Sequence, residues 1–409
     1  MNKNTITKII YIKFGELVLK GKNRCQFSVL LLRNIKKALF DFKKLIFIYK
    51  YDAILIKNIP NQSFVEIFDI VKMIPGIRLV IEANIIPRNQ TKLCSFLLKN
   101  LPKKVFFTFK VKTKRIDKKY PINSLEFDRN IGDFILKKFS HAKVDVHQPQ
   151  ILINIEINDK HFIVYFNKQK GLGGFPLGIN GRVLVLISGG IDSPVASHLL
   201  MKRGFHVDFL TFISPPHTTK KSLSKTIDLI KKITLSKRIE QKPILYICNF
   251  TPLQHEIAHI SNHSYQITIM RRYFFRIGQY LAKLYKYSAI ATGENLGQVA
   301  SQTIESIITI SDVIKDTIVL RPLLTYDKEE IIAIAKKIGS FEISILPYPD
   351  ACSGFVPTNP VTKPKITVAK KLEKEMIMIK PIYEKTIKSI IKKEIFHGNR
   401  QRCERRVPL

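Results

Sequence analysis

The sequence predicts an α/β protein whose main part is a doubly wound parallel sheet, preceded by a smaller α+β region. Three observations predict this fold class. After residue 181, short apolar runs alternate with stretches of helical periodicity, as in βαβ units. Before residue 168, strand-like runs are more frequent, and strands and helices do not simply alternate. The chain has 409 residues, more than the roughly 250–300 at which one core stops growing, so several domains are expected.

The first region, up to residue 86, is expected to contain four strands and two helices. Alternating residues predict strands, and apolar residues at helical spacing predict helices. The expected elements are strands 7–14, 45–50, 53–58 and 78–86 and helices 22–40 and 62–73. Their order, β-α-β-β-α-β, is the split βαβ arrangement of a ferredoxin-like fold.

The next region, 88–168, is expected to mix helices with strands and is rich in basic residues. Its expected elements are helices 91–100 and 122–140 and strands 104–112, 151–157 and 161–166. The basic residues are Lys110, Lys112, Lys114, Arg115, Lys118, Lys119 and Arg129. Because side chains alternate along a strand, the first three lysines are expected on one face, where they could contact phosphates. An edge strand protected from aggregation by lysines would show the same pattern, so both interpretations stay open here.

The glycine-rich stretch 171–181 is expected to be a turn or linker, after which strands and helices alternate. The expected strands are 183–187, 207–213, 244–249 and 288–291, and the expected helices are 194–203, 219–238, 264–286 and 328–338. The last helix has the clearest signals, with Asp327 as its N-cap, Glu330 three residues later and Gly339 at its end.

The strongest local motif is VLVLISGGIDSPVAS at 183–197, in which an apolar strand runs into a glycine loop and a helix. Two glycines let the backbone approach an anion, and hydroxyls and free amides at the start of a helix can hold phosphate oxygens. The residues of this predicted phosphate loop are Ser188, Gly189, Gly190, Asp192 and Ser193. Asp192 is also the candidate ligand for Mg²⁺, which prefers oxygen ligands.

Composition limits the class of protein. Lys and Arg number 68 and Asp and Glu 32, a net charge of +36 that favours a polyanionic partner such as nucleic acid, although part of it fits a general richness in lysine. No apolar run approaches the ~20 residues of a membrane span and no signal peptide is evident, so we expect a cytoplasmic protein without a membrane partner. The five cysteines are scattered without a C-x-x-C pair, which argues against a disulfide framework or a zinc site.

The SGGIDS loop resembles the PP-loop of ATP pyrophosphatases, which cleave ATP between the α and β phosphates and transfer AMP to a substrate oxygen. Other runs resemble one family with this loop, the tRNA uridine 4-sulfurtransferases, or tRNA 4-thiouridine synthetases. These runs are Phe14-Gly15-Glu16 with LVLKGKNRCQF, TFKVKTKRIDKKYPINSLEFDRNIG at 108–132, FISPPHT at 212–218, ITIMRRYFFRIG at 267–278, ATGENLGQVASQT at 291–303, RPLL at 321–324 and CSGFVPTNPVTKP at 352–364. The resemblance covers nearly the whole chain in the family's order.

The resemblance implies a ferredoxin-like domain at 1–75, a THUMP RNA-binding domain at 76–168, a linker at 169–181 and a PP-loop adenylating domain at 182–409. It implies that the 4-oxygen of a tRNA uridine, position 8 in the family, attacks the α-phosphate of ATP, and that a persulfide sulfur then displaces AMP. Asp192 with Mg²⁺ would support the first step. The implied partners are tRNA, a cysteine desulfurase and a second copy of the chain in a homodimer.

The same resemblance implies a set of ATP-site residues outside the glycine loop. They are Leu186, Ile187, Thr211, Phe212, Arg271, Gly293 and Gln302. Arg271 is expected to clamp phosphate charge, because a guanidinium matches phosphate geometry.

Cys352 is the main catalytic candidate for sulfur transfer, because it coincides with the family's cysteine in this domain and thiolates are the nucleophilic form. Cys403, in a basic tail, is the second candidate, whereas the others are expected to be structural, namely Cys25, Cys94 and Cys248. Some members carry a C-terminal rhodanese domain that holds the persulfide, and no such domain is expected here. Sulfur supply for the thiazole of thiamine goes with that domain and is not carried over, and an iron–sulfur route is disfavoured because Cys248 lacks a C-x-x-C partner.

Two other functions stay open at this point. A PP-loop amide synthetase would use the same loop, but it would leave residues 1–168 unexplained and would be indifferent to Cys352. An RNA-binding module with a vestigial ATP site would explain the charge, but the intact loop argues against it.

Overall fold

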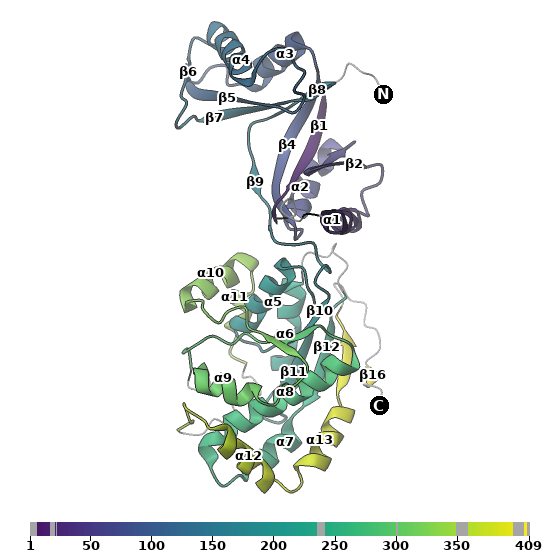
Figure 1. The fold of residues 1–409 in the computed structure, drawn as a ribbon, viewed down its shortest axis with the longest axis vertical. Coiled ribbons are helices and arrows are strands. Elements are labelled where there is room, and N and C mark those ends of the chain that lie inside the picture. The colour runs from purple at the N-terminus through teal and green to yellow at the C-terminus, as the bar shows by residue number, and fades with distance from the viewer. Residues whose placement is uncertain are drawn as a thin grey trace. The chain divides into compact units, whose positions relative to one another are not determined.

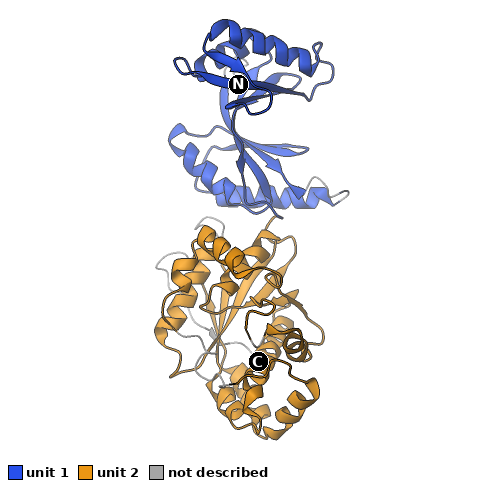
Figure 2. Ribbon diagram, turned by 90° about the vertical axis from the view of Figure 1, so that its left-hand side faces the viewer, with its two compact units in different colours: residues 1–174 blue, residues 175–409 orange. Residues whose placement is uncertain are grey.

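The computed structural model describes residues 6–16, 21, 23–234, 242–299, 302–348, 359–395 and 405–406. It divides into two compact units, Met1–Gly174 and Phe175–Leu409, which are coloured separately in Figure 2. Each unit has its own sheet and its own hydrophobic core. The α/β class predicted from the sequence, with an α+β region before it, is confirmed.

Unit 1 is built on one continuous sheet of nine strands (Figure 1). The strand order is β2-β3-β1-β4-β8-β7-β5-β6, and β9 pairs with β4. The strands are β1 (Thr7–Phe14), β2 (Ile46–Lys50), β3 (Ala53–Lys57), β4 (Ile77–Pro87), β5 (Phe107–Arg115), β6 (Ala142–Val144), β7 (Ile151–Ile157), β8 (His161–Tyr165) and β9 (Gln169–Lys170). The helices are α1 (Arg24–Ala38), α2 (Phe64–Lys72), α3 (Gln90–Asn100) and α4 (Ser124–Lys138).

The first half of unit 1 has the predicted ferredoxin-like arrangement. β1 pairs antiparallel with both β3 and β4, and β2 pairs with β3. β1 therefore lies between β3 and β4, as expected for the split βαβ arrangement. In the second half, α3 and α4 cover one face of the sheet, where Phe109 and Ile153 lie in the core with Leu93 and Ile131. β4 joins the halves because it pairs with β1 and, near its end, with β8.

Three details of unit 1 differ from the sequence expectations. β5 ends at Arg115 rather than at 112, and the short strands β6 and β9 were not expected. β9 lies at the start of the linker that the resemblance implies at 169–181. Next to it, an added Cβ on Gly171 would lie 2.4 Å from the carbonyl oxygen of Ile77, so the chain passes too close to β4 for any side chain there.

Unit 2 contains the predicted doubly wound sheet, in the order β14-β13-β10-β11-β12-β15-β16 (Figure 1). The strands from β14 to β12 are parallel, and β15 and β16 are antiparallel additions. The strands are β10 (Arg182–Leu186), β11 (His206–Ile213), β12 (Ile244–Asn249), β13 (Ala289–Ala291), β14 (Ile318–Leu320), β15 (Ile391–Glu394) and β16 (Arg405–Arg406). The helices are α5 (Asp192–Lys202), α6 (Lys220–Ile233), α7 (Thr251–Ala258), α8 (Gln266–Leu284), α9 (Ile304–Ser311), α10 (Lys328–Ile338), α11 (Phe341–Ser344), α12 (Ile366–Glu375) and α13 (Ile379–Lys388).

The direction of winding reverses at β10. From β10 the chain continues to β11 and β12 on one side, and it returns to β13 and β14 on the other. The helices α7, α8, α12 and α13 share one core with the sheet. The helices α5, α6, α10 and α11 pack on one another, and α5 also contacts β10 and β11. Ligands of doubly wound sheets bind at the carboxyl ends of the strands at such a reversal, which is where the glycine loop follows β10.

The helix signals of unit 2 were accurate where capping residues marked them. α10 begins after Asp327, whose capping box with Glu330 is present, and it ends at Gly339 with φ 71°. α5 begins at Asp192, two residues before the predicted start at Pro194. The predicted helix 219–238 is observed as α6 to Ile233, and its predicted last residues from 235 lie outside the described part.

Candidate active site

The loop between β10 and α5 is folded around two serine side chains. The Ser193 hydroxyl accepts a hydrogen bond from the Ser188 amide at 2.9 Å, and it lies 3.2 Å from the Ser188 hydroxyl. The Gly190 amide donates to the Ser188 hydroxyl at 3.3 Å. No described side chain caps α5, so the positive end of this helix faces the loop. The loop is therefore a candidate cradle for an anion.

Gly293, after β13, packs directly on the first turn of α5. An added Cβ would lie 2.7 Å from the Ser193 nitrogen and 2.8 Å from the Ser193 Cα. Only glycine allows this contact, because both neighbouring atoms are backbone and cannot rotate away. The structure thus brings the predicted residue Gly293 to the cradle from a different strand.

The predicted residues at the ends of β10 and β11 are neighbours. Leu186 pairs with Leu210, and the Ile187 amide donates to the Leu210 carbonyl at 2.8 Å. Next along β11, Thr211 is buried, and the Phe212 ring stacks on Phe274 with centroids 3.8 Å apart. Leu186 and Phe212 pack against the hydrophobic core that contains Phe274, so these strand ends lie together at the carboxyl edge of the sheet.

Asp192 has a cationic partner that sequence reasoning missed. The Lys328 ammonium, on the first residue of α10, lies 2.6 Å from Asp192 Oδ1. Gln298 donates to the other carboxylate oxygen at 3.5 Å. The only sequence signal for Lys328 was its place at a helix start, since 136 positions separate it from Asp192.

The donor set around Asp192 suits Mg²⁺ only together with a ligand. The described residues contain no group of three or more His, Cys, Asp and Glu side chains that could hold a metal. Mg²⁺ is commonly bound by one or two carboxylates plus substrate phosphates. The residues present therefore fit a metal that arrives with ATP, held by Asp192 and the phosphates.

Arg271 does not stand alone in the structure. It forms an ion pair with Glu294, a carboxylate whose side chain is 3% exposed, and Glu294 also accepts from Arg321 Nε at 2.6 Å. Burial acts to raise the pKa of Glu294, but the two guanidiniums outweigh it and hold that pKa below its usual range. Glu294 and Arg321 were not among the residues predicted from the sequence, although both lie in the runs that carried the resemblance.

Gln302 closes the loop that begins at Gly293. Its carbonyl accepts from the Gly297 amide at 2.9 Å, and its amide donates to Val299 at 2.8 Å. Its side-chain oxygen Oε1 is buried without a hydrogen-bond partner in the described structure. A buried acceptor in this state is costly, so this oxygen is a candidate contact for a bound ligand.

The two cysteines predicted to carry sulfur, Cys352 and Cys403, lie outside the described residues. Among the others, Cys248 is buried in β12, and burial raises the pKa of its thiol, which suits a structural role. Ser344 lies in the segment that precedes Cys352 in the chain, and its hydroxyl donates to the carbonyl of Gly190 in the glycine loop at 3.2 Å.

The basic residues of unit 1 do not share one surface. Lys110, Lys112 and Lys114 alternate with the core residues Phe109 and Val111, so they project from the face of β5 opposite to α3 and α4. Arg129 is exposed on α4, over the other face, and Arg115 donates to the Tyr120 carbonyl at 3.1 Å. Lys118 and Lys119 are exposed after β5.

A buried carboxylate lies on the lysine side of this sheet. Glu156 of β7 accepts from Tyr11 at 2.8 Å and from Tyr165 at 3.2 Å, and it forms an ion pair with Lys13. Lys50 of β2 donates to Asn158 at 3.2 Å. Because β2 and β7 are far apart in strand order, the sheet must curl strongly, and it does so around this polar cluster.

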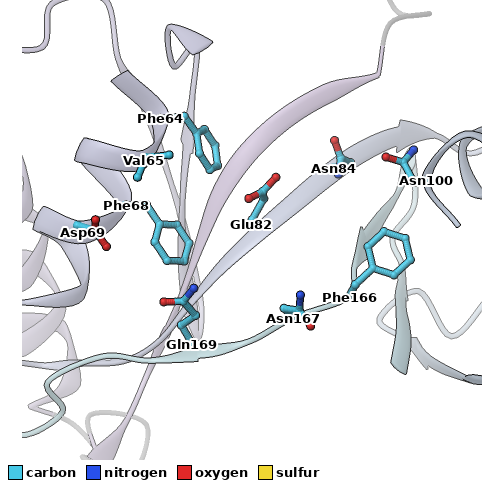
Figure 3. Close-up of a pocket in the computed structure, with 10 residues that line it drawn as sticks. All are labelled: Phe64, Val65, Phe68, Asp69, Glu82, Asn84, Asn100, Phe166, Asn167 and Gln169. Carbon is cyan, nitrogen blue, oxygen red and sulfur yellow. The ribbon is translucent and has the colours of Figure 1, made fainter. Parts of the chain in front are cut away.

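A cavity of about 360 Å³ lies elsewhere in unit 1, between α2, β4 and the segment after β8. Figure 3 shows the rings of Phe64 and Phe68 on α2 facing the strand that carries Glu82 and Asn84. The remaining lining residues are Val65, Asp69, Asn100, Phe166, Asn167 and Gln169. All of them belong to unit 1, so this cavity is separate from the glycine loop of unit 2.

Comparison with known proteins agrees with this geometry. Residues 178–378 match the family described as "Thiamine biosynthesis protein (ThiI)", 92–167 match "THUMP domain" and 9–80 match "ThiI ferredoxin-like domain". A Ureaplasma parvum protein named "Probable tRNA sulfurtransferase" is 50% identical over 379 residues, which are 92% of this chain and 96% of the relative. The chain belongs to the tRNA sulfurtransferase family.

Further members of the tRNA sulfurtransferase family, and solved structures, extend the match. A Mycoplasma genitalium protein with the same name is 41% identical over 93% of this chain and 97% of its own length. A crystal structure titled as a 4-thiouridine synthetase–RNA complex with bound ATP matches 95% of this chain and all of that one, with TM-score 0.83 and 32% identity. A Pyrococcus horikoshii protein, PH1313, shares the fold at TM-score 0.61 and 22% identity, over 81% of this chain and 99% of its own. Within the described residues of this sulfurtransferase-family chain, no helix combines the length and apolar character that crossing a bilayer requires.

Proposed function

We propose that this enzyme uses ATP to convert a uridine of tRNA, position 8 in the family, into 4-thiouridine. The observation that carries the proposal is the match over nearly the whole chain to a 4-thiouridine synthetase that was crystallised with RNA and ATP. The cradle of Ser188 and Ser193, with Gly293 packed against it, supports ATP binding at the glycine loop of this chain.

In the first step, the 4-oxygen of the uridine attacks the α-phosphate of ATP, and pyrophosphate leaves. The glycine loop and the amino end of α5 would hold the leaving phosphates, which is the anion chemistry that free amides at a helix start provide. Mg²⁺, carried by Asp192 and the phosphates, would neutralise charge that develops on them. Lys328 is close enough to Asp192 to add a second positive charge at this point.

In the second step, the terminal sulfur of a persulfide forms a bond to C4 of the uracil as the C4–O bond to AMP breaks. A second thiol then cleaves the sulfur–sulfur bond, so that 4-thiouridine is released and a disulfide remains. We assign the persulfide to Cys352, with Cys403 as the alternative or as the second thiol, and a cysteine desulfurase as the sulfur source. The same proposal includes a homodimer and a cytoplasmic location. It also includes four domain limits, namely 1–75, 76–168, 169–181 and 182–409.

The test is a reconstituted reaction with ATP, Mg²⁺, unmodified tRNA and a persulfide donor, followed by mass spectrometry of the tRNA nucleosides. We expect 4-thiouridine with the unchanged protein and none with Cys352→Ser. Cys25→Ser, which changes an exposed cysteine of α1, is the matched control and is expected to keep activity. Product without Cys352 would refute the assignment of that thiol, and no 4-thiouridine from the unchanged protein would refute the function.

The RNA surface can be tested by salt dependence. The lysines of β5 and Arg129 lie on opposite faces of the sheet, and we assign RNA to the lysine face. Each phosphate contact that is lost lowers the slope of log affinity against log salt by roughly 0.7–0.9. Lys112→Gln and Lys114→Gln are each expected to do so, whereas Arg129→Gln is expected to leave the slope unchanged. The reverse result would assign RNA to the α4 side.

A further inference from the structure

The carbonyl of Gly190, in the glycine loop, lies where a helix normally supplies a hydrogen bond from the residue four positions later. In an α-helix each amide donates to the carbonyl four residues before it. Ile191 has the helical angles φ -75° and ψ -36°, and Asp192 and Ser193 begin α5, so the backbone from 190 to 194 follows a helical path. The residue at 194 is proline, which has no N–H. Pro194 therefore cannot give the Gly190 carbonyl its helical donor.

The Ser344 hydroxyl takes the place of that donor. It donates to the Gly190 carbonyl at 3.2 Å, although 154 positions separate the two residues. Ser344 is 6% exposed and is the last residue of α11. The chain is held on both sides of this contact, because Phe341 packs against the core that α11 shares with α5, and the Lys225 ammonium donates to the Leu346 carbonyl at 2.8 Å. The hydroxyl is therefore presented to the glycine loop from a fixed support.

This hydrogen bond fixes the plane of the peptide between Gly190 and Ile191. A trans peptide is planar, so its carbonyl and its N–H point in opposite directions. With the carbonyl held toward Ser344, the Ile191 amide points away from Ser344. Because Ile191 has helical angles, this amide is aligned with those of Asp192 and Ser193 at the start of α5. The first amides of a helix have no partner within the helix and are the groups that can hold phosphate oxygens.

We propose that Ser344 is a positioning residue for phosphate binding, which holds the Gly190 carbonyl so that the Ile191 amide stays turned toward the phosphates of ATP. It supplies from α11 the donor that Pro194 cannot supply from α5. Without it the peptide plane can rotate, and only the fraction of molecules with the amide correctly turned binds phosphate, so the affinity falls by that fraction. This inference rests on the proposed function, in which the glycine loop and the amino end of α5 hold the phosphates.

The experiment uses calorimetry to measure the affinity of the full-length protein, with Mg²⁺, for an ATP analogue that has a methylene bridge between the α and β phosphates. Ser344→Ala is expected to weaken binding roughly 3- to 10-fold, the factor that one hydrogen bond contributes. Pro194→Ala, which adds an N–H at this position, is expected to bind about as tightly as the unchanged protein. In the double variant that N–H can donate to the Gly190 carbonyl, so the affinity is expected to recover, which a merely structural role of Ser344 would not produce.

Ser340→Ala is the matched control. Ser340 is also buried, and its hydroxyl also donates to a backbone carbonyl, that of Ala335 at 3.4 Å, but this bond joins α10 to the start of α11. The substitution is therefore expected to leave analogue affinity unchanged. Thermal unfolding of every variant identifies loss of fold. If Ser344→Ala does not fold, Ser344→Cys, whose thiol is a weak donor, replaces it and is expected to weaken binding in the same direction, with the same recovery by Pro194→Ala.

The outcomes separate this inference from the function beneath it. If the unchanged protein binds the analogue and Ser344→Ala binds it equally tightly, the role of Ser344 is refuted and the ATP site stands. The role is also refuted if the double variant binds as weakly as Ser344→Ala, because Ser344 would then act only through the packing of α11. If the unchanged protein does not bind the analogue, the proposed ATP site is wrong, and the role of Ser344 is wrong with it.

Discussion

Gly293→Ala is the most direct test of the site geometry. The added Cβ would lie 2.7 Å from the Ser193 nitrogen, 2.8 Å from the Ser193 Cα and 2.9 Å from the Asp192 carbonyl carbon. Favourable contact between carbon atoms lies at about 3.5–4.0 Å, so the loop after β13 and the first turn of α5 would have to separate by about 1 Å. Neither side can yield by rotating a side chain, because all three atoms are backbone.

The expected cost follows from that displacement. Overpacking of this kind destabilises a fold by about 1–3 kcal/mol, and a 1 Å misplacement of groups at a reacting centre can cost about 10²-fold in rate. Gly293→Ala is therefore expected to slow tRNA-dependent pyrophosphate release about 100-fold and to lower the melting temperature by a few degrees. The assay follows pyrophosphate at saturating tRNA over a range of ATP concentrations.

The control for this substitution is Gly278→Ala on α8. Its added Cβ would lie 3.4 Å from a Leu186 side-chain carbon, close to an ordinary contact. In a helix interior, Gly to Ala usually stabilises by about 0.5–1 kcal/mol, so activity is expected to be retained. If Gly293→Ala released pyrophosphate within twofold of the unchanged rate, the close packing of this loop on α5 would not matter for catalysis, and the reasoning would be refuted.

Three further predictions concern charged and titratable groups. Lys328→Gln is expected to slow pyrophosphate release about 100-fold, as does the loss of one group that stabilises developing charge. Because its ion pair with Asp192 is half-exposed, the same change is expected to alter the free energy of unfolding by less than about 1 kcal/mol. Urea titration beside the kinetic assay separates the effect on rate from the effect on stability. Glu156→Gln leaves Lys13 without its buried partner and is expected to destabilise unit 1 by about 3 kcal/mol, whereas Glu82→Gln, in an exposed pair, is expected to cost under about 0.5 kcal/mol. Burial, with two nearby lysines, lowers the pKa of His198 to about 4. Below about pH 6.5 this histidine therefore binds a proton in the unfolded chain but not in the folded one. The contribution of His198 to the free energy of unfolding is then fully present above that pH and falls by about 2 kcal/mol at pH 5. Denaturant titrations at pH 7 and pH 5 check this, and an unchanged pH dependence in His198→Gln would contradict it.

The sequence could predict the parts of the site that lie at the carboxyl ends of neighbouring parallel strands. Strands and helices alternate after 181, so the ends of β10, β11 and β13 had to meet at one sheet edge, and the structure has Ile187, Thr211 and Gly293 there. Glycine and hydroxyl residues after an apolar strand likewise predicted the cradle. These are local patterns whose consequence for the fold is general.

Pairings between distant segments could not be predicted in the same way. Lys328 is one of 68 basic residues, and nothing in its neighbourhood distinguishes it from lysines on solvated helix faces. Its contact with Asp192 depends on how α10 packs against α5, which is a matter of tertiary structure. The division of the basic residues between two faces of the sheet is similar, since it required knowing that α4 covers the face opposite to Lys112.

Each cation near the glycine loop has a carboxylate partner. Lys328 pairs with Asp192, and Arg271 and Arg321 share Glu294. Because these cations already have carboxylate partners, ATP binding is expected to release few counterions from the protein. RNA on the exposed lysines of β5 would instead release the ions condensed along its own backbone. Salt is therefore expected to weaken RNA binding steeply and ATP binding only slightly. The net charge of +36 thus overstates the charge that is available to ATP, and it bears mainly on the attraction between the protein and RNA.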